Sequence, residues 1–338
     1  MQALEARSEN RLLEFIKGIW RDYSVVVMFF VIIGICGLAA PRFLTPGNLL
    51  NILRNTSIVG SIALGMTFVI IAGGIDLSSG PVFATAGAVL IFLQRMKNVD
   101  GSPAMPLVVP ILAACAVAVA FGFVNGAVIT KAKLPPFIVT LAVGIIARSV
   151  TMYIARGATV MGNNVPEFNQ IGSGSVFATG QPGGFPGIPI PFLVVIVMAI
   201  LFHILLTRTK YGTYVFAVGG NENAARFSGI KVDRIRIITY MLVGLCTGIA
   251  STMEMSRMVA VAAATSGSQY EFEAITAVIV GGTSLMGGKG RLVGTIVGFI
   301  ILGIVNNMMI MLNISPYLSG AVKGAVILFA VLMQRRER

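Results

Sequence analysis

The stretch Leu107–Ile129, LVVPILAACAVAVAFGFVNGAVI, contains 23 residues and no charged side chain. A helix that crosses the roughly 30 Å hydrocarbon core of a bilayer needs about 20 such residues. Comparable apolar runs occur at Val25–Ala40, Pro191–Thr207 and Val293–Leu312. The chain is therefore expected to cross a membrane several times.

The composition agrees with this interpretation. Of 338 residues, 56% are hydrophobic and 11% are charged, whereas about a quarter of the residues are charged in soluble domains. The formal net charge of +12 does not predict nucleic-acid binding, because the basic residues lie between the apolar runs and form no basic face. Basic residues that flank membrane spans are typical of membrane topology.

We expect an all-α fold, a polytopic bundle of about ten transmembrane helices. Gly and Pro interrupt several of these helices, as at Gly73-Gly74 and Gly281-Gly282, and broken helices are tolerated at membrane depth where they line a cavity or are buried in protein. The expected spans lie near residues 24–40, 57–73, 81–95, 107–130, 136–155, 190–207, 237–256, 272–286, 292–313 and 318–333.

Charge predicts the orientation. If the N-terminus is cytoplasmic, 17 basic residues lie in cytoplasmic segments and six lie in outside segments, so the positive-inside rule places both termini inside. We thus expect a cytoplasmic segment at 1–23, a permease domain at 24–333 and a cytoplasmic tail at 334–338. Within the domain, the loop 156–189 is expected outside and the basic loop 208–236 inside.

No motif of hydrolytic or redox chemistry is present. The stretch Gly282–Gly290 partly matches a phosphate-binding loop, but Thr283 occupies the first glycine position and Gly290 replaces the Ser/Thr that would hold magnesium. We therefore expect that this chain is not an enzyme and holds no cofactor or metal. If ATP drives the protein, the ATPase is another chain.

Polar residues inside the spans are candidates for a transport pathway. Asp76 and Ser78 precede Pro81 and either cap a helix or line an unwound polar stretch, where they could hydrogen-bond sugar hydroxyls. Asn125, Thr140 and Asn306 lie inside apolar runs. They either form hydrogen bonds between helices or contribute to the same pathway.

Four groups of motifs occur in order along the chain. They are Asn48–Leu53 with Ala63–Ser78, Ala217–Ile230, Tyr270–Gly290, and Asn313–Tyr317 with Lys323-Gly324. Together they resemble the ribose/galactose/xylose class of carbohydrate ABC-importer permeases from about residue 24 onward. The related branched-chain amino-acid permeases fit these motifs less well. The resemblance implies a bacterial inner-membrane protein that imports a monosaccharide.

The resemblance also implies the partners. These are a second permease subunit, which would form a homodimer, a cytoplasmic ATP-binding subunit that holds ATP and magnesium, a periplasmic sugar-binding protein, and membrane lipid. One cytoplasmic loop resembles the coupling helix that sits on the ATPase, and Asn221 and Gly229 are residue types that start and end helices. Its residues are Gly220, Asn221, Glu222, Ala224, Ala225, Arg226, Ser228 and Gly229.

Two other functions remain open from the residues. An ion-coupled secondary transporter would need ionisable groups inside the membrane, and Asp76, Glu254 and Lys323 could serve. An integral-membrane enzyme would need a catalytic constellation that the motifs above do not supply. Dependence of uptake on ATP or on an ion gradient would separate the two transporter classes.

Overall fold

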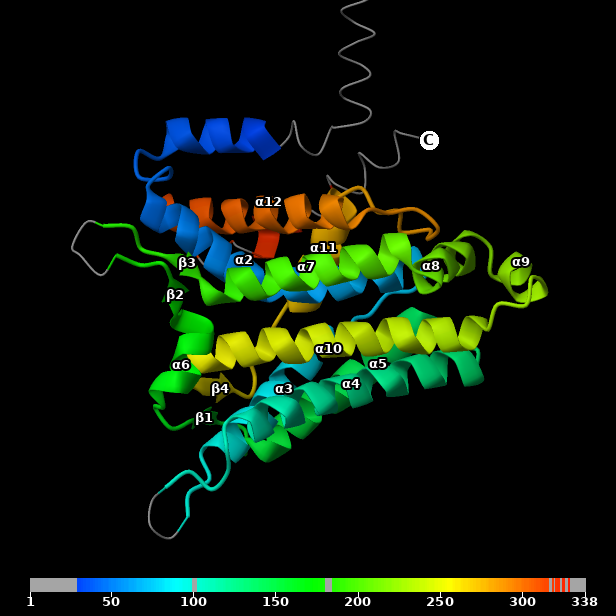
Figure 1. Cartoon of the computed structure of the whole chain (residues 1–338), viewed down its shortest axis with the longest axis horizontal. Coiled ribbons are helices and arrows are strands. Elements are labelled where there is room, and N and C mark those ends of the chain that lie inside the picture. The colour runs from blue at the N-terminus through cyan, green and yellow to red at the C-terminus, as the bar shows by residue number, and fades with distance from the viewer. Residues whose placement is uncertain are drawn as a thin grey trace, which may run out of the picture.

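The computed structural model describes residues 29–98, 102–179 and 184–315, with residues 318, 320–322, 324, 325 and 328 beyond them. The predicted terminal segments 1–23 and 334–338 lie outside the described residues, as does most of the predicted span 318–333. The described part is a helix bundle, which confirms the predicted all-α class (Figure 1).

Within the part of the chain that the structure describes, six helices are long and apolar enough to cross a membrane. They are α2 (Pro46–Ile71), α4 (Val108–Lys131), α5 (Pro136–Ile154), α7 (Ile190–Arg208), α10 (Val232–Met258) and α12 (Leu292–Met311). Two apolar helices are shorter, Phe29–Ala39 and α3 (Ser79–Gln94). Each of these eight helices lies at a predicted span.

The predicted span 272–286 is wrong in length. The helix α11 covers only Tyr270–Val280, 11 residues, or about 16 Å at 1.5 Å per residue, which is roughly half of the hydrocarbon core. It ends where Gly281 packs against the backbone of α12. The approach is close, since a Cβ on Gly281 would lie 2.4 Å from the carbonyl carbon of Gly294. The chain then turns at Gly282, whose φ of +84° favours glycine.

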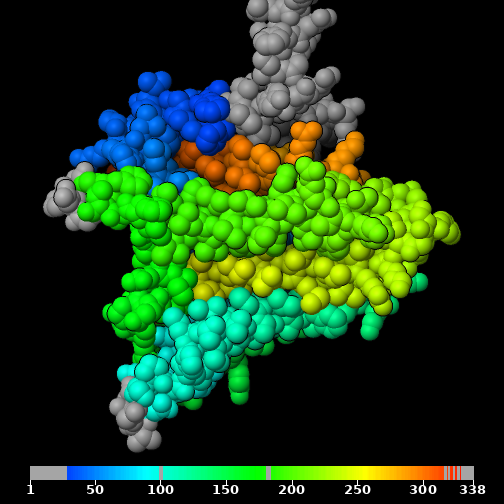
Figure 2. Space-filling view, in the orientation of Figure 1, coloured from blue at the N-terminus to red at the C-terminus, as the bar shows by residue number. Residues whose placement is uncertain are grey.

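Burial separates inner from outer helices. In α2, 83% of the apolar span is buried, compared with 28% in α4 and 33% in both α5 and α7. The outer helices carry exposed large apolar side chains, such as Val124 on α4 and Val197 on α7. Figure 2 shows α7, α10 and α4 along one face of the bundle. This apolar outer surface suits contact with lipid.

The contact between α4 and α10 is built from small residues. Gly122 and Gly126 on α4 are four residues apart, and so are Gly244 and Gly248 on α10. A Cβ on Gly244 would lie 2.3 Å from the carbonyl oxygen of Ala118. Small residues at this spacing let helix backbones approach closely, and such packing drives association between helices in lipid.

The remaining elements lie mainly at the two ends of the bundle. At one end are α6 (Pro166–Ser173) and two short antiparallel ribbons. The ribbons pair β1 (Thr159–Met161) with β4 (Ala260–Ala262), and β2 (Ser175–Val176) with β3 (Ile188–Pro189). At the other end are α8 (Lys210–Gly220) and α9 (Glu222–Phe227) (Figure 1).

Candidate transport and coupling sites

The chain makes an elbow between α2 and α3. It turns at Gly73, whose φ is +78°, and α3 then begins at Ser79, two residues before the predicted start at Pro81. Oδ1 of Asp76 accepts hydrogen bonds from the backbone N–H of Ser78 at 2.8 Å and from its hydroxyl at 2.6 Å. Asp76 thus fixes the residue from which α3 starts.

Two further helices contribute to this elbow. The Asn125 amide on α4 donates to the Ser78 hydroxyl at 2.7 Å, and the backbone N–H of Leu77 donates to the Thr140 hydroxyl on α5 at 3.1 Å. The structure therefore brings together four of the five predicted pathway residues, Asp76, Ser78, Asn125 and Thr140. Their exposed fractions are 2%, 1%, 0% and 0%. In this conformation they hold the elbow in place, and their role in a pathway stays a prediction.

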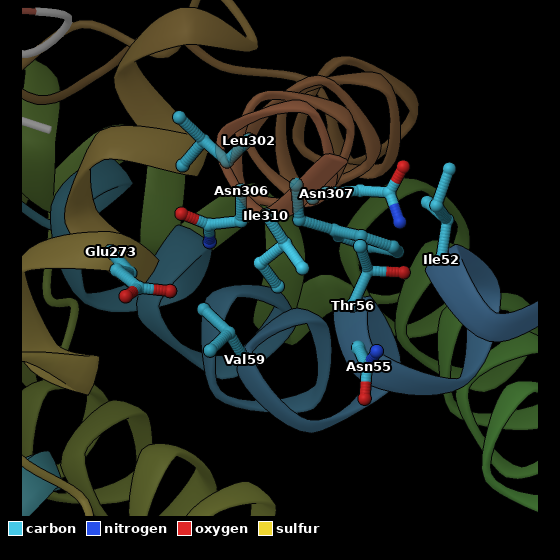
Figure 3. Close-up of a pocket in the computed structure, with 11 residues that line it drawn as sticks. Ile52, Asn55, Thr56, Val59, Glu273, Leu302, Asn306, Asn307 and Ile310 are labelled. Carbon is cyan, nitrogen blue, oxygen red and sulfur yellow. The ribbon is translucent and has the colours of Figure 1, made fainter. Parts of the chain in front are cut away.

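The fifth predicted residue, Asn306, lies elsewhere. It lines a recess of about 250 Å³ between α2, α11 and α12 (Figure 3). Apolar side chains form most of its wall, and polar groups come from all three helices. The lining residues are Ile52, Asn55, Thr56, Val59, Glu273, Phe299, Leu302, Gly303, Asn306, Asn307 and Ile310.

Adjacent asparagines on α12 differ in their hydrogen bonding. Asn307 exchanges two side-chain hydrogen bonds with Asn48, at 2.8 Å and 3.1 Å, and it joins the start of α2 to α12. The partly buried side chain of Asn306 forms no hydrogen bond with any described residue. Asn307 is therefore a structural residue, whereas the amide of Asn306 remains available to a ligand.

Sequence reasoning missed Glu273. This carboxylate lies in the first turn of α11, where the positive end of the helix dipole stabilises negative charge. Figure 3 shows it directed into the same part of the recess as the Asn306 amide. The signal was present, because Glu271 and Glu273 are two acidic residues at the start of an otherwise apolar segment.

The helix predicted in the loop 208–236 is confirmed. Asn221 occupies the N-cap of α9, and its Oδ1 accepts from the backbone N–H of Ala224 at 3.0 Å. The helix ends at Phe227, and Gly229 then has a φ of +82°. Phe227 is 92% exposed. α9 therefore presents an apolar side chain at the end of the bundle.

Ion pairs tie α9 to the start of α10. Arg226 contacts Glu222 at 3.2 Å and Asp233 at 2.9 Å, and Arg236 contacts Glu222 at 2.7 Å. Hydrogen bonds to Asp233 and Glu222 raise the pKa of Arg226. Each pair is partly exposed and contributes little to stability alone, but together they fix the direction of α9.

The backbone of α8 touches the end of α2. A Cβ on Gly219 would lie 1.7 Å from the carbonyl oxygen of Ile71, and that oxygen accepts a hydrogen bond from the N–H of Gly288 at 2.8 Å. A Cβ on Gly287 would lie 3.0 Å from Gly73. The loop that carries α9 is thus in backbone contact with the elbow that contains Asp76.

Long apolar helices, a short half-spanning helix and polar groups at membrane depth define a multi-pass membrane transporter. Residues 48–331 match the family described as "Branched-chain amino acid transport system / permease component". The chain belongs to this permease family, and it is a multi-pass protein of the bacterial inner membrane.

The relatives are similar over their whole length. The chain is 38% identical to the ribose import permease protein of Bacillus subtilis, over 100% of this chain and 99% of the relative. It is 37% identical to the ribose import permease protein of Escherichia coli K12, over 96% and 97%, and 36% identical to the L-arabinose transport system permease protein of the same organism, over 95% and 92%. No solved structure matches the chain.

Proposed function

We propose that this chain is the membrane-spanning subunit of an ABC importer that carries a monosaccharide, ribose or a similar pentose or hexose, into the cell. The observation that carries the proposal is full-length similarity to ribose import permeases, at 38% and 37% identity. Similarity to a D-allose and an L-arabinose transport permease, at 32% and 36% identity, favours sugars as the substrate class.

The energy for transport comes from a partner. ATP and magnesium bind to a separate cytoplasmic ATPase, a periplasmic binding protein delivers the sugar, and two copies of this chain form the permease. The sequence supports this division, because the stretch Gly282–Gly290 lacks the residues that would hold a nucleotide and its metal.

The ATPase docks on α9. Phe227 and the charged residues around Glu222 offer an apolar contact surrounded by fixed charges. Closure of the ATPase would move α9 and α8, and the contact between Gly219 and Ile71 would pass that motion to α2 and the elbow at Asp76. Opening and closing the pathway in this way is alternating access.

The alternative is an ion-coupled secondary transporter. Its candidate coupling groups are Asp76, Glu254 and Lys323, and Lys323 lies outside the described residues. Asp76 is buried in its network, and Glu254 accepts a hydrogen bond from the Tyr270 hydroxyl at 2.7 Å. Both carboxylates are thus engaged within the bundle, which favours the ABC importer.

The test is uptake of radiolabelled ribose by the chain reconstituted in liposomes with its ATPase and binding protein. Uptake is expected to require ATP inside the liposomes together with the binding protein, and to persist when ionophores collapse the ion gradients. Uptake that needs no ATPase and stops with the gradients would establish the secondary transporter instead. Competition by allose and arabinose would define the sugar class.

A further inference from the structure

The recess between α2, α11 and α12 has the chemistry of a small-solute site. Val59, Phe299 and Leu302 supply apolar walls, and five polar side chains lie among them: Asn55, Thr56, Glu273, Asn306 and Asn307. Ligand sites are usually apolar cavities in which a small number of polar groups fix orientation. The volume of about 250 Å³ lies below the roughly 300–1,000 Å³ of sites for drug-sized ligands and suits a smaller solute.

We propose that this recess is a binding station for a neutral monosaccharide on its way through the permease, with Asn306 and Glu273 as its hydrogen-bonding groups. The inference rests on the proposed function and assigns a place within it. An amide both donates and accepts, and a carboxylate accepts, so the pair can satisfy several sugar hydroxyls. The apolar walls would cover the C–H faces of the sugar ring.

The comparison of Asn306 with Asn307 supports this assignment. Both amides lie on α12 beside the same recess, but among the described residues only Asn307 finds partners, in its reciprocal bonds to Asn48. An amide that only joins helices would be bonded in the same way. Asn306 instead points with Glu273 into the recess (Figure 3).

The position of Glu273 gives a second, independent reason. An ionisable residue inside a membrane-spanning bundle is costly and usually marks a pathway. Glu273 lies at the start of a helix of 11 residues, so a helix end within the bundle is directed at the recess. In the predicted orientation, the recess lies in the outer half of the bundle, where sugar from a binding protein would arrive first.

The first test is sugar uptake by Asn306→Leu and Glu273→Gln in the complete transporter. Each is expected to raise the half-saturating sugar concentration roughly threefold to tenfold, as for one lost hydrogen bond, with normal amounts of assembled complex. The control is Ser149→Ala on α5, whose hydroxyl is exposed and bonds back to Ile145; it should leave uptake unchanged. Asn307→Leu should instead reduce the amount of assembled complex.

The second test is labelling of Asn306→Cys by a membrane-impermeant sulfonate thiol reagent. The new thiol should react, and sugar supplied with the binding protein should slow the reaction severalfold. Val197→Cys on α7 is the control, because Val197 is 56% exposed on the apolar outer surface and its thiol should not react in lipid. Native Cys36 and Cys246 are buried, whereas Cys115 on α4 is partly exposed, so both variants are made in a Cys115→Ser background to keep native labelling low.

The outcomes separate the two proposals. If the wild-type complex transports sugar but Asn306→Leu and Glu273→Gln keep wild-type kinetics, or the Asn306→Cys thiol is unreactive or insensitive to sugar, the recess is not the binding station. If the wild-type complex transports no sugar, the proposed function fails. A shift in half-saturation with sugar-dependent protection establishes both.

Discussion

Adding one methyl group to the seam between α4 and α10 should destabilise the protein measurably. In Gly244→Ala the new Cβ would lie 2.3 Å from the carbonyl oxygen of Ala118, and it must retreat by about 0.7 Å to reach 3.0 Å, below which real Cβ contacts essentially never fall. The obstacle is backbone, so no rotamer change relieves it. If the two helices separate by this distance, the atoms along their contact lose about a quarter or more of their dispersion energy.

The net effect can be estimated. Overpacking a close contact costs about 1–3 kcal/mol, and a rigid neighbour favours the upper end. Replacing Gly by Ala inside a helix stabilises the helix by about 1 kcal/mol. We therefore expect a net loss of about 2 kcal/mol, which corresponds to a fall in Tm of about 3 °C for a chain of 338 residues.

The assay is thermal unfolding of the purified protein in detergent, followed by fluorescence. Gly47→Ala on α2 is the matched control, because a Cβ at Gly47 meets no atom within 4 Å, so its Tm should stay the same or rise slightly. If Gly244→Ala unfolds at the same temperature as the wild type and the control, the small-residue seam does not set the distance between these helices.

The elbow and α9 yield further predictions. Asp76→Ala should reduce the amount of folded protein seen by size-exclusion chromatography, because it leaves the buried N–H of Ser78 without its acceptor, a loss of about 1–3 kcal/mol; Asp76→Asn keeps an acceptor oxygen and should fold better. Equal yields of the two variants would contradict this. Charge reversal in Glu222→Lys breaks the contacts with Arg226 and Arg236 and should leave ATP hydrolysis without matching sugar uptake. The control Glu167→Lys, on α6 at the other end, should remain coupled, and equal coupling in both would refute the docking role.

Hydrophobic length predicted the long helices well but not their ends. The span predicted at 57–73 begins 11 residues earlier, at Pro46, because helical hydrogen bonding continues through the polar turns around Asn48 and Asn55. α10 likewise begins at Val232 and not at 237. Hydropathy detects the apolar part of a helix, whereas the helix itself ends where a turn or a cap interrupts its backbone hydrogen bonds.

The candidate sites differ in how much of each could be predicted from the sequence. The N-cap at Asn221 was predictable because it depends on one local hydrogen bond. Asp76, Ser78 and Asn125 were recognised from the sequence as polar residues inside apolar runs. Their meeting at one elbow could not be predicted, because it depends on how α4 and α5 pack in the tertiary structure. Glu273 and Asn306 are 33 positions apart in the sequence, and only the packing of α11 against α12 places them at one recess.

The contact of Gly219 with Ile71 has a mechanical consequence. Where helices meet through long side chains, rotamer changes absorb small displacements, and a push at one end fades along the way. Here the backbones of Gly219 and Ile71 meet with no side chain between them. The N–H of Gly288 also donates a hydrogen bond to the carbonyl oxygen of Ile71, which holds a third segment of the chain at this contact. Such a backbone contact is rigid. A small displacement of α9 would therefore move the end of α2, inside the bundle, by almost the same distance.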